Sequence, residues 1–194
     1  MRRLPPVALV VALLLVPILA AEKVRRPQAS SGHDYPLAVG MRWTYRTVGS
    51  VAAVRELKRE IDVPGGRCFE MSYSLPVFGV RTVLMRRCTD GIETLEDGRP
   101  VLLLRFPMRV GDRWRIDLKG QELADCEVMG EEVIPVIGKP TSTTRLKVVR
   151  TNRRSGKSVT DFEWYAKGIG LVQMRVTFGI TATFALERFE RVAP

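Results

Sequence analysis

The chain has few of the side chains that metal binding and nucleophilic catalysis use. Among its 194 residues are one histidine, His33, and three cysteines, Cys68, Cys88 and Cys126. A Ser-His-Asp or Cys-His site needs an imidazole within the folded domain, and a structural zinc site needs clustered cysteine or histidine ligands. His33 falls in a polar N-terminal stretch, and no Gly-x-Ser-x-Gly elbow occurs. The sequence therefore predicts no catalytic residue, no metal site and no cofactor, and we expect the protein not to be an enzyme.

A long hydrophobic run is absent beyond residue 19. Val7–Leu19 is apolar apart from Pro17, and it is shorter than the roughly 20 residues that span a bilayer. Two arginines precede it and two alanines follow it, which is typical of a secretory signal. The sequence therefore predicts a signal peptide over residues 1–21, a flexible leader over 22–34 and export to the periplasm or the extracellular space. An uncleaved N-terminal anchor is the alternative.

Export changes the interpretation of the three cysteines, because thiols outside the cytoplasm tend to pair. Cys68 and Cys88 flank an apparent hairpin whose turn is centred near Phe78. Residues directly opposite each other in a hairpin have Cβ atoms about 4.5–5.5 Å apart, close to disulfide geometry. The pattern predicts a Cys68–Cys88 disulfide and leaves Cys126 as a buried free thiol. Pairing of Cys126 with either of the others stays open at this point.

Strand patterns dominate the chain from Tyr35 onward. Apolar residues alternate with polar ones in several runs, and turn signals recur about every ten residues. Val51–Glu60 contains good helix formers, but its apolar residues fall on odd positions, so a strand is favoured. We expect an all-β fold, an antiparallel curved sheet that forms a half-barrel or a sandwich. Four aromatic residues are expected on the inward faces, where they line either the core or an apolar ligand cavity: Trp43, Tyr45, Trp114 and Trp164.

The chain repeats one of its own segments. Tyr35–Trp43 reappears 71 residues later as Phe106–Trp114, with proline, valine, glycine, arginine and tryptophan at matched positions. Proline fixes φ and glycine permits positive φ, so both copies suit the start of a strand after a turn. We therefore expect a single domain over residues 35–194 that is built from two β-meanders, about 35–105 and 106–190.

Basic residues outnumber acidic ones, and the formal net charge is +10 at pH 7. The arginines are spread over many predicted strands, whereas nucleic-acid modules combine a basic stripe with exposed stacking aromatics. The pattern argues against nucleic-acid binding. The positive charge is compatible with peripheral contact with an anionic membrane surface. It is equally compatible with a monomer whose surface arginines only keep it soluble.

Two motifs resemble those of a known group of proteins. Trp164-Tyr165-Ala166-Lys167-Gly168-Ile169-Gly170-Leu171-Val172 is similar to the closing signature of the TapB-like group of exported bacterial proteins. Pro36-Leu37, Gly40, Trp43 and Tyr45 are similar to the N-terminal motif of the same group. Together the motifs bracket residues 35–176. In outline such proteins resemble the curved β half-barrels of lipoprotein carriers, a likeness that implies a concave face able to hold acyl chains. Those carriers also use lid helices, which this sequence does not predict.

Two functions are compatible with these observations. The first is a noncatalytic exported envelope protein that acts as an interaction or structural module and docks on another envelope protein. The alternative is a carrier or binder of a lipid or other apolar ligand in the concave face of the sheet. The expected partner is accordingly an envelope protein or an apolar ligand, and its identity is beyond the sequence.

Overall fold

A computed structural model describes residues 35–48, 50–75, 79–118, 122–178 and 180–192. The predicted signal peptide, the predicted leader and His33 lie outside the described residues. Within the described ranges, no helix is long and apolar enough to cross a membrane.

Twelve strands form one antiparallel sheet, which confirms the all-β prediction. Ser50–Val63 is a strand, as the odd-position apolar residues indicated. The strands are β1 (Met41–Thr47), β2 (Ser50–Val63), β3 (Gly66–Leu75), β4 (Gly79–Cys88), β5 (Gly91–Glu96), β6 (Arg99–Arg105), β7 (Arg113–Leu118), β8 (Glu122–Val136), β9 (Lys139–Asn152), β10 (Ser158–Ala166), β11 (Gly170–Phe178) and β12 (Ile180–Arg191).

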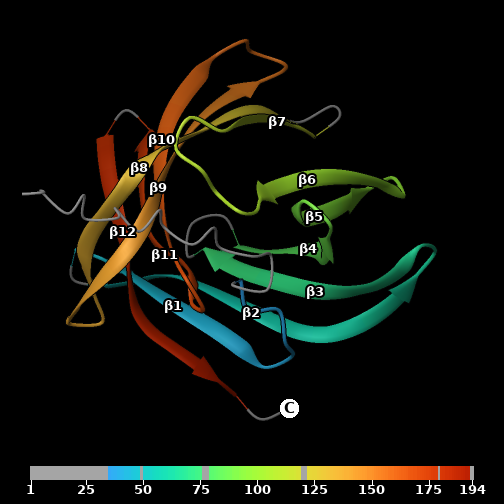
Figure 1. The fold of residues 1–194 in the computed structure, drawn as a ribbon, viewed down its shortest axis with the longest axis horizontal. Helices are drawn as coiled ribbons and strands as arrows, with labels where there is room; N and C mark the ends of the chain where they lie inside the picture. Colours follow the sequence, from blue (N-terminus) through green and yellow to red (C-terminus); the bar gives the residue numbers. More distant parts are fainter. Residues whose placement is uncertain (1–34, 49, 76–78, 119–121, 179, 193–194) are drawn as a thin grey trace, which may run out of the picture.

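The sheet curves round into a barrel-like shape (Figure 1). Its strand order is β6-β5-β4-β3-β2-β1-β12-β11-β10-β9-β8-β7, so each half of the chain forms a six-stranded meander and β1 pairs with β12 where the halves meet. β6 and β7 end the order, and no ladder joins them in the part of the chain that the structure describes. They approach each other at a seam, where Trp114 Nε1 donates a hydrogen bond to the Leu103 carbonyl at 3.2 Å.

The two copies of the repeated segment adopt the same local geometry. Gly40 has φ of 84° and Gly111 has φ of 87°, a region that glycine enters without steric cost. The Gly40 N–H donates to the Leu57 carbonyl at 2.8 Å, and the Gly111 N–H donates to the Val128 carbonyl at 2.9 Å. Since both bonds span the same sequence separation, the repeat encodes one turn that ties the start of a strand to a more distant strand.

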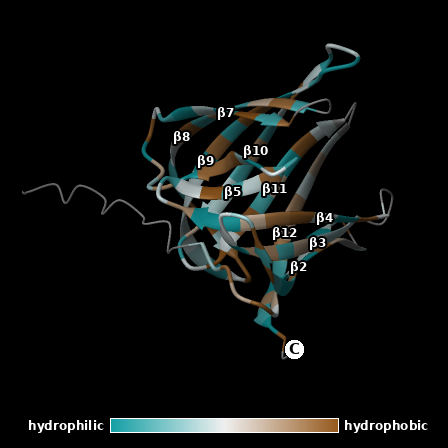
Figure 2. Ribbon diagram, turned by 90° about the vertical axis from the view of Figure 1, so that its right-hand side faces the viewer, coloured by the Kyte–Doolittle hydropathy of each residue, from teal (hydrophilic) through white to brown (hydrophobic). Residues whose placement is uncertain are grey.

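Alternation along the strands builds the core on the inner side of the sheet. Figure 2 shows apolar and polar residues interleaved along the strands. Trp43 is 1% exposed, and its indole N–H donates to the Ile169 carbonyl at 2.7 Å. The Tyr45 hydroxyl donates to the Leu171 carbonyl at 2.9 Å. Because Ile169 and Leu171 belong to the second half of the chain, these two side chains also tie the halves together.

The predicted Cys68–Cys88 disulfide is wrong, because Cys68, Cys88 and Cys126 are all free thiols. The β3–β4 hairpin pairs Leu75 with Gly79 and Phe69 with Met85. Continued by one step, this register sets Arg86 opposite Cys68, so Cys88 is displaced by two residues along the ladder. Diagonal neighbours of that kind lie about 7–8 Å apart, too far for a disulfide. The strand register therefore differs by two residues from the pairing that the sequence suggested.

Candidate functional site

A cavity of about 320 Å³ lies inside the curve of the sheet and is lined by residues of both halves of the chain. Its volume is at the small end of the roughly 300–1,000 Å³ typical of ligand sites. The lining side chains come from strands β2 to β10 and from Tyr35, which precedes β1. The cavity is therefore a product of the curvature and not of any one hairpin.

Most of the cavity wall is apolar. Cross-strand pairing explains this, because directly paired residues point to the same face of a sheet. On one side Cys126 pairs with Val148, and on the other Met71 pairs with Val83. The aliphatic and methionine part of the wall consists of Met71, Val83, Met85, Leu95, Leu103, Leu104, Ile116, Leu118, Leu146 and Val148.

One pole of the cavity carries a buried charge cluster around Arg150. Its guanidinium donates to Glu122 Oε1 at 2.8 Å, to Asp161 Oδ2 at 2.9 Å and to Glu163 Oε1 at 2.8 Å. Asp161 is 1% exposed and Glu163 is 6% exposed. Burial disfavours the charge of Arg150, and the carboxylates of Glu163, Glu122 and Asp161 outweigh that effect, so the pKa of Arg150 is raised. The arginine therefore stays charged and holds three strands together.

Asp161 is the member of this cluster with a buried oxygen that has no hydrogen-bond partner. Burial raises the pKa of its carboxyl, while the nearby Arg150 opposes the rise. Oδ2 is bonded to Arg150, but Oδ1 is buried without a hydrogen-bond partner. A buried oxygen of this kind costs free energy, so the cluster depends on the single cation at its centre.

The other pole of the cavity carries Arg55 among tyrosines. The Arg55 guanidinium carbon lies 5.6 Å from the centre of the Tyr45 ring and 5.5 Å from that of Tyr73. The Tyr35 side chain also interacts with the guanidinium. Burial raises the pKa of the Tyr35, Tyr45 and Tyr165 hydroxyls, so the phenols stay protonated at neutral pH. The Tyr165 hydroxyl donates to Glu163 Oε2 at 2.5 Å and so connects the two poles.

Cys126 lies on the cavity wall, near the charges of Glu163 and Arg150. Burial, and next the nearby Glu163 carboxylate, raise the pKa of its thiol to about 12. A thiol that stays protonated at neutral pH is a poor nucleophile. The interpretation of Cys126 as a buried free thiol is confirmed.

The four aromatic residues expected on inward faces are all buried in the core, and none of them lines this cavity. Trp164 is buried with the core residues, on a different face of its strand from the cavity. Glu163 and Tyr165 on either side of it line the cavity, so alternation points Trp164 to the outer face of β10. There its indole N–H donates to Glu132 Oε1 at 2.5 Å, and the Arg175 guanidinium lies 5.7 Å from its ring centre. Long polar side chains thus bury an outward tryptophan.

The charged residues at the two poles were not identified from the sequence, although a signal for them exists. Arg55 stands in the inward phase of β2, between Ala53 and Leu57, which are both buried. Asp161 and Glu163 likewise stand in phase with Tyr165. A charged residue at a strand position that alternates with buried apolar residues faces the interior. There the charged group needs a partner.

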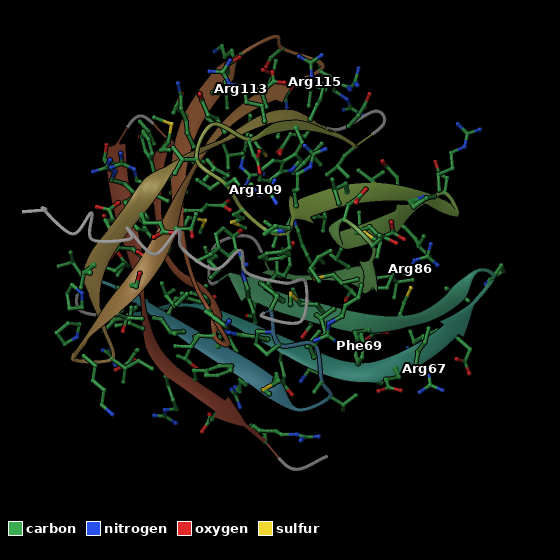
Figure 3. The ribbon with its side chains drawn as sticks, viewed as in Figure 1. Arg67, Phe69, Arg86, Arg109, Arg113 and Arg115 are labelled. Atoms are coloured by element: carbon green, nitrogen blue, oxygen red, sulfur yellow. The ribbon has the colours of Figure 1, made fainter. Side chains whose placement is uncertain are left out.

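Several arginines, including the labelled Arg67, Arg86, Arg113 and Arg115 of Figure 3, pair with acids on neighbouring strands. Arg67 binds Glu60 at 2.9 Å and Arg115 binds Asp125 at 2.7 Å. Arg86 pairs with Glu93 and Arg113 with Glu127 in the same manner. These four arginines are therefore locally neutralised and do not form a basic patch.

Comparison with solved structures gives two matches. A protein from Bacteroides fragilis, described as exported and with a YmcC-like fold, has a TM-score of 0.52 and is 15% identical; the match covers 84% of this chain and 100% of that one. A protein from Parabacteroides distasonis, described as a lipoprotein, has a TM-score of 0.48 and is 14% identical, with 84% and 100% covered.

No family model matches the chain, and no curated protein matches it. The first likeness shows a shared fold: this chain is a curved all-β protein similar to the YmcC-like structure. The resemblance to the TapB-like group stays a prediction.

Proposed function

We propose that this protein is exported and noncatalytic, and that it binds a small amphipathic ligand in the cavity of its curved sheet. The cavity itself is the observation that carries the proposal: about 320 Å³ of space whose wall combines aliphatic side chains with convergent polar and charged groups. That combination is typical of small-molecule sites. The predicted signal peptide supports export, and the neighbours of similar fold are described as an exported protein and a lipoprotein.

Native mass spectrometry and organic extraction of the protein purified after export test the proposal. We expect a co-purified amphipathic compound, or displacement of an environment-sensitive fluorophore by added amphiphiles. A matched pair of variants locates the site. Val83 lines the cavity, so Val83→Phe should fill it and weaken binding at least tenfold, whereas Val80→Phe on the same strand changes an exposed residue and should leave binding unchanged.

The proposal fails if no amphiphile is extracted and none displaces the fluorophore, or if both variants bind like the unaltered protein. The intact mass of the exported protein tests the location separately. We expect the mass of a chain that begins after residue 21, and a retained N-terminal segment would favour the anchor.

Docking on another envelope protein is the second candidate. Its supporting observation is that β6 and β7 end the strand order, which leaves backbone groups for strand addition. A photo-crosslinker at Arg115 on β7 should then capture one dominant partner, while the same crosslinker at exposed Lys58 on the interior strand β2 should not. Equal capture from both positions would contradict docking through the edge.

A further inference from the structure

The two arginines that face the cavity have different partners. Arg150 donates to three carboxylates. Arg55 forms no ion pair with a carboxylate among the residues that the structure describes; aromatic rings and a tyrosine side chain surround it instead. A cation–π contact stabilises a guanidinium, but it uses the face of the group and not its N–H donors. Arg55 thus faces the cavity without a carboxylate partner of its own, although Glu122 and Glu163, which bind Arg150, line the same cavity.

Arg55 is half-buried, and a charge withdrawn in part from water loses solvation free energy unless a partner compensates it. An apolar residue at position 55 would avoid this cost. Ala53 and Leu57, which point to the same side of the strand, are ordinary core residues. The planar fork of arginine matches the two oxygens of a carboxylate. The arrangement is therefore suited to a ligand that brings one anionic group.

We propose that the ligand is an acyl chain with a terminal carboxylate, and that Arg55 binds the carboxylate while the chain lies against the apolar wall. The wall beside and opposite Arg55 includes Met71, Met85, Leu104, Ile116 and Val148. This inference rests on the proposed ligand-binding function and specifies its chemistry.

The opposite pole argues against a cationic headgroup. Both oxygens of Glu163 already accept hydrogen bonds, one from Arg150 and one from Tyr165. The unpartnered Oδ1 belongs to Asp161, which is 1% exposed and is not among the residues that line the cavity. Each carboxylate of this cluster already binds Arg150, whereas no carboxylate pairs with Arg55 among the residues that the structure describes.

The size of the cavity limits the chain. A volume of about 320 Å³ is at the lower end of the range for ligand sites. We therefore expect a chain of short to medium length in place of a two-chain phospholipid.

Isothermal titration calorimetry with decanoate, decanol and decylamine, three probes of equal chain length, tests the proposed headgroup. Each probe is added at neutral pH to the protein purified after export. Bound amphiphile is first removed on a hydrophobic resin. We expect decanoate to bind roughly tenfold or more tightly than the other two, because hydrogen bonds to a charged group are worth that much. Arg55→Met keeps the apolar stem and removes the charge, so it should lower decanoate affinity to that of decanol and leave decanol binding unchanged.

Arg59→Met is the matched control. Arg59 lies on the same strand, is exposed, and pairs with Glu70 at 2.9 Å, so its replacement removes the same charge outside the cavity. It should leave the preference for decanoate intact, which distinguishes local binding from a change in net charge.

The outcomes separate the two proposals. If decanoate and decanol bind equally well to the unaltered protein, or if Arg55→Met keeps the preference, headgroup recognition by Arg55 is overturned while ligand binding stands. Tightest binding of decylamine overturns it too. If none of the probes binds, both proposals fail. Should Arg55→Met not fold, the comparison of the three probes on the unaltered protein decides the headgroup by itself.

Discussion

Single residues inside the curve of the sheet show two ways to stabilise a half-buried charge. Arg150 is held by Glu122, Asp161 and Glu163, with three donor–acceptor distances of 2.8–2.9 Å. Arg55 is held by the faces of aromatic rings. The first arrangement is complete without a ligand, and we propose that the second is completed by one. The stability of the folded chain should therefore depend more strongly on Arg150 than on Arg55.

Replacement of Arg150 by methionine should reduce the free energy of unfolding by about 3–5 kcal/mol, because it leaves buried carboxylates without their cation. Urea denaturation followed by circular dichroism measures the change. Arg153→Met is the control, since Arg153 pairs with Asp117 at the surface and exposed pairs contribute at most about 1 kcal/mol. Equal losses for both variants would show that the cluster does not stabilise the fold.

The tyrosines near Arg55 should make the protein unstable in alkali. Burial raises the pKa of Tyr35, Tyr45 and Tyr165, whereas tyrosines in the unfolded chain ionise near pH 10. Above about pH 10 the unfolded chain therefore releases protons that the folded chain retains, and the free energy of unfolding falls as the pH rises. Tyrosinate absorbance and circular dichroism should change together. Ionisation of these three phenols near pH 10 with intact structure would contradict the prediction.

At the scale of elements, the repeated turn before β1 and before β7 has different surroundings in its two copies. A Cβ atom on Gly40 would lie 2.0 Å from the backbone oxygen of Val192, whereas one on Gly111 would meet nothing within 4 Å. Gly40 adjoins the point where β1 pairs with β12, and its carbonyl accepts a hydrogen bond from the Val192 N–H at 2.7 Å. The same local conformation thus serves a close backbone contact in one half only.

Gly111→Ala should lower the free energy of unfolding by about 1–2 kcal/mol, the cost of a left-handed conformation in an alanine. Gly40→Ala should cost clearly more, because the backbone of β12 must also move. The midpoints of chemical denaturation of the two variants provide the comparison, each acting as the control for the other. A larger effect at Gly111 than at Gly40 would refute the role given to the β12 contact.

At the scale of the whole molecule, the sheet is continuous through β1 and β12 and discontinuous between β6 and β7. Trp114 bridges the discontinuity through its hydrogen bond to Leu103. The indole of Trp43 makes a similar bond to Ile169, but within the continuous part. The seam is therefore the place where the barrel-like shape depends on side chains instead of a backbone ladder.

Trp114→Phe should remove about 1 kcal/mol of stability and should increase hydrogen exchange of the backbone amides in β6 and β7 specifically. Local opening of this kind is expected where few backbone hydrogen bonds hold an edge. Trp43→Phe removes a similar bond elsewhere and should not raise exchange at the seam. Mass spectrometry of deuterium uptake measures both, and an unchanged β6 in Trp114→Phe would mean that other contacts close the seam.

Several features of the site could be predicted from the sequence and others could not. Period-two alternation indicated the strands, and the repeat at Tyr35 and Phe106 indicated two similar turns. The partner of Cys68 depended on where the β3–β4 turn is centred, and an error of one residue there moves every pair by two. The outward position of Trp164 was hidden because arginine and glutamate stems can bury an aromatic ring on an outer face.

The sequence by itself determined that the chain is all-β, since alternation of apolar and polar residues is a local property of each strand. Only the tertiary structure decided that the sheet curves enough to form a cavity, and that Arg55 and Arg150 face it from different strands with different partners. Curvature and burial are sums over contacts between distant strands, such as β1 with β12, and no single segment of the chain contains them.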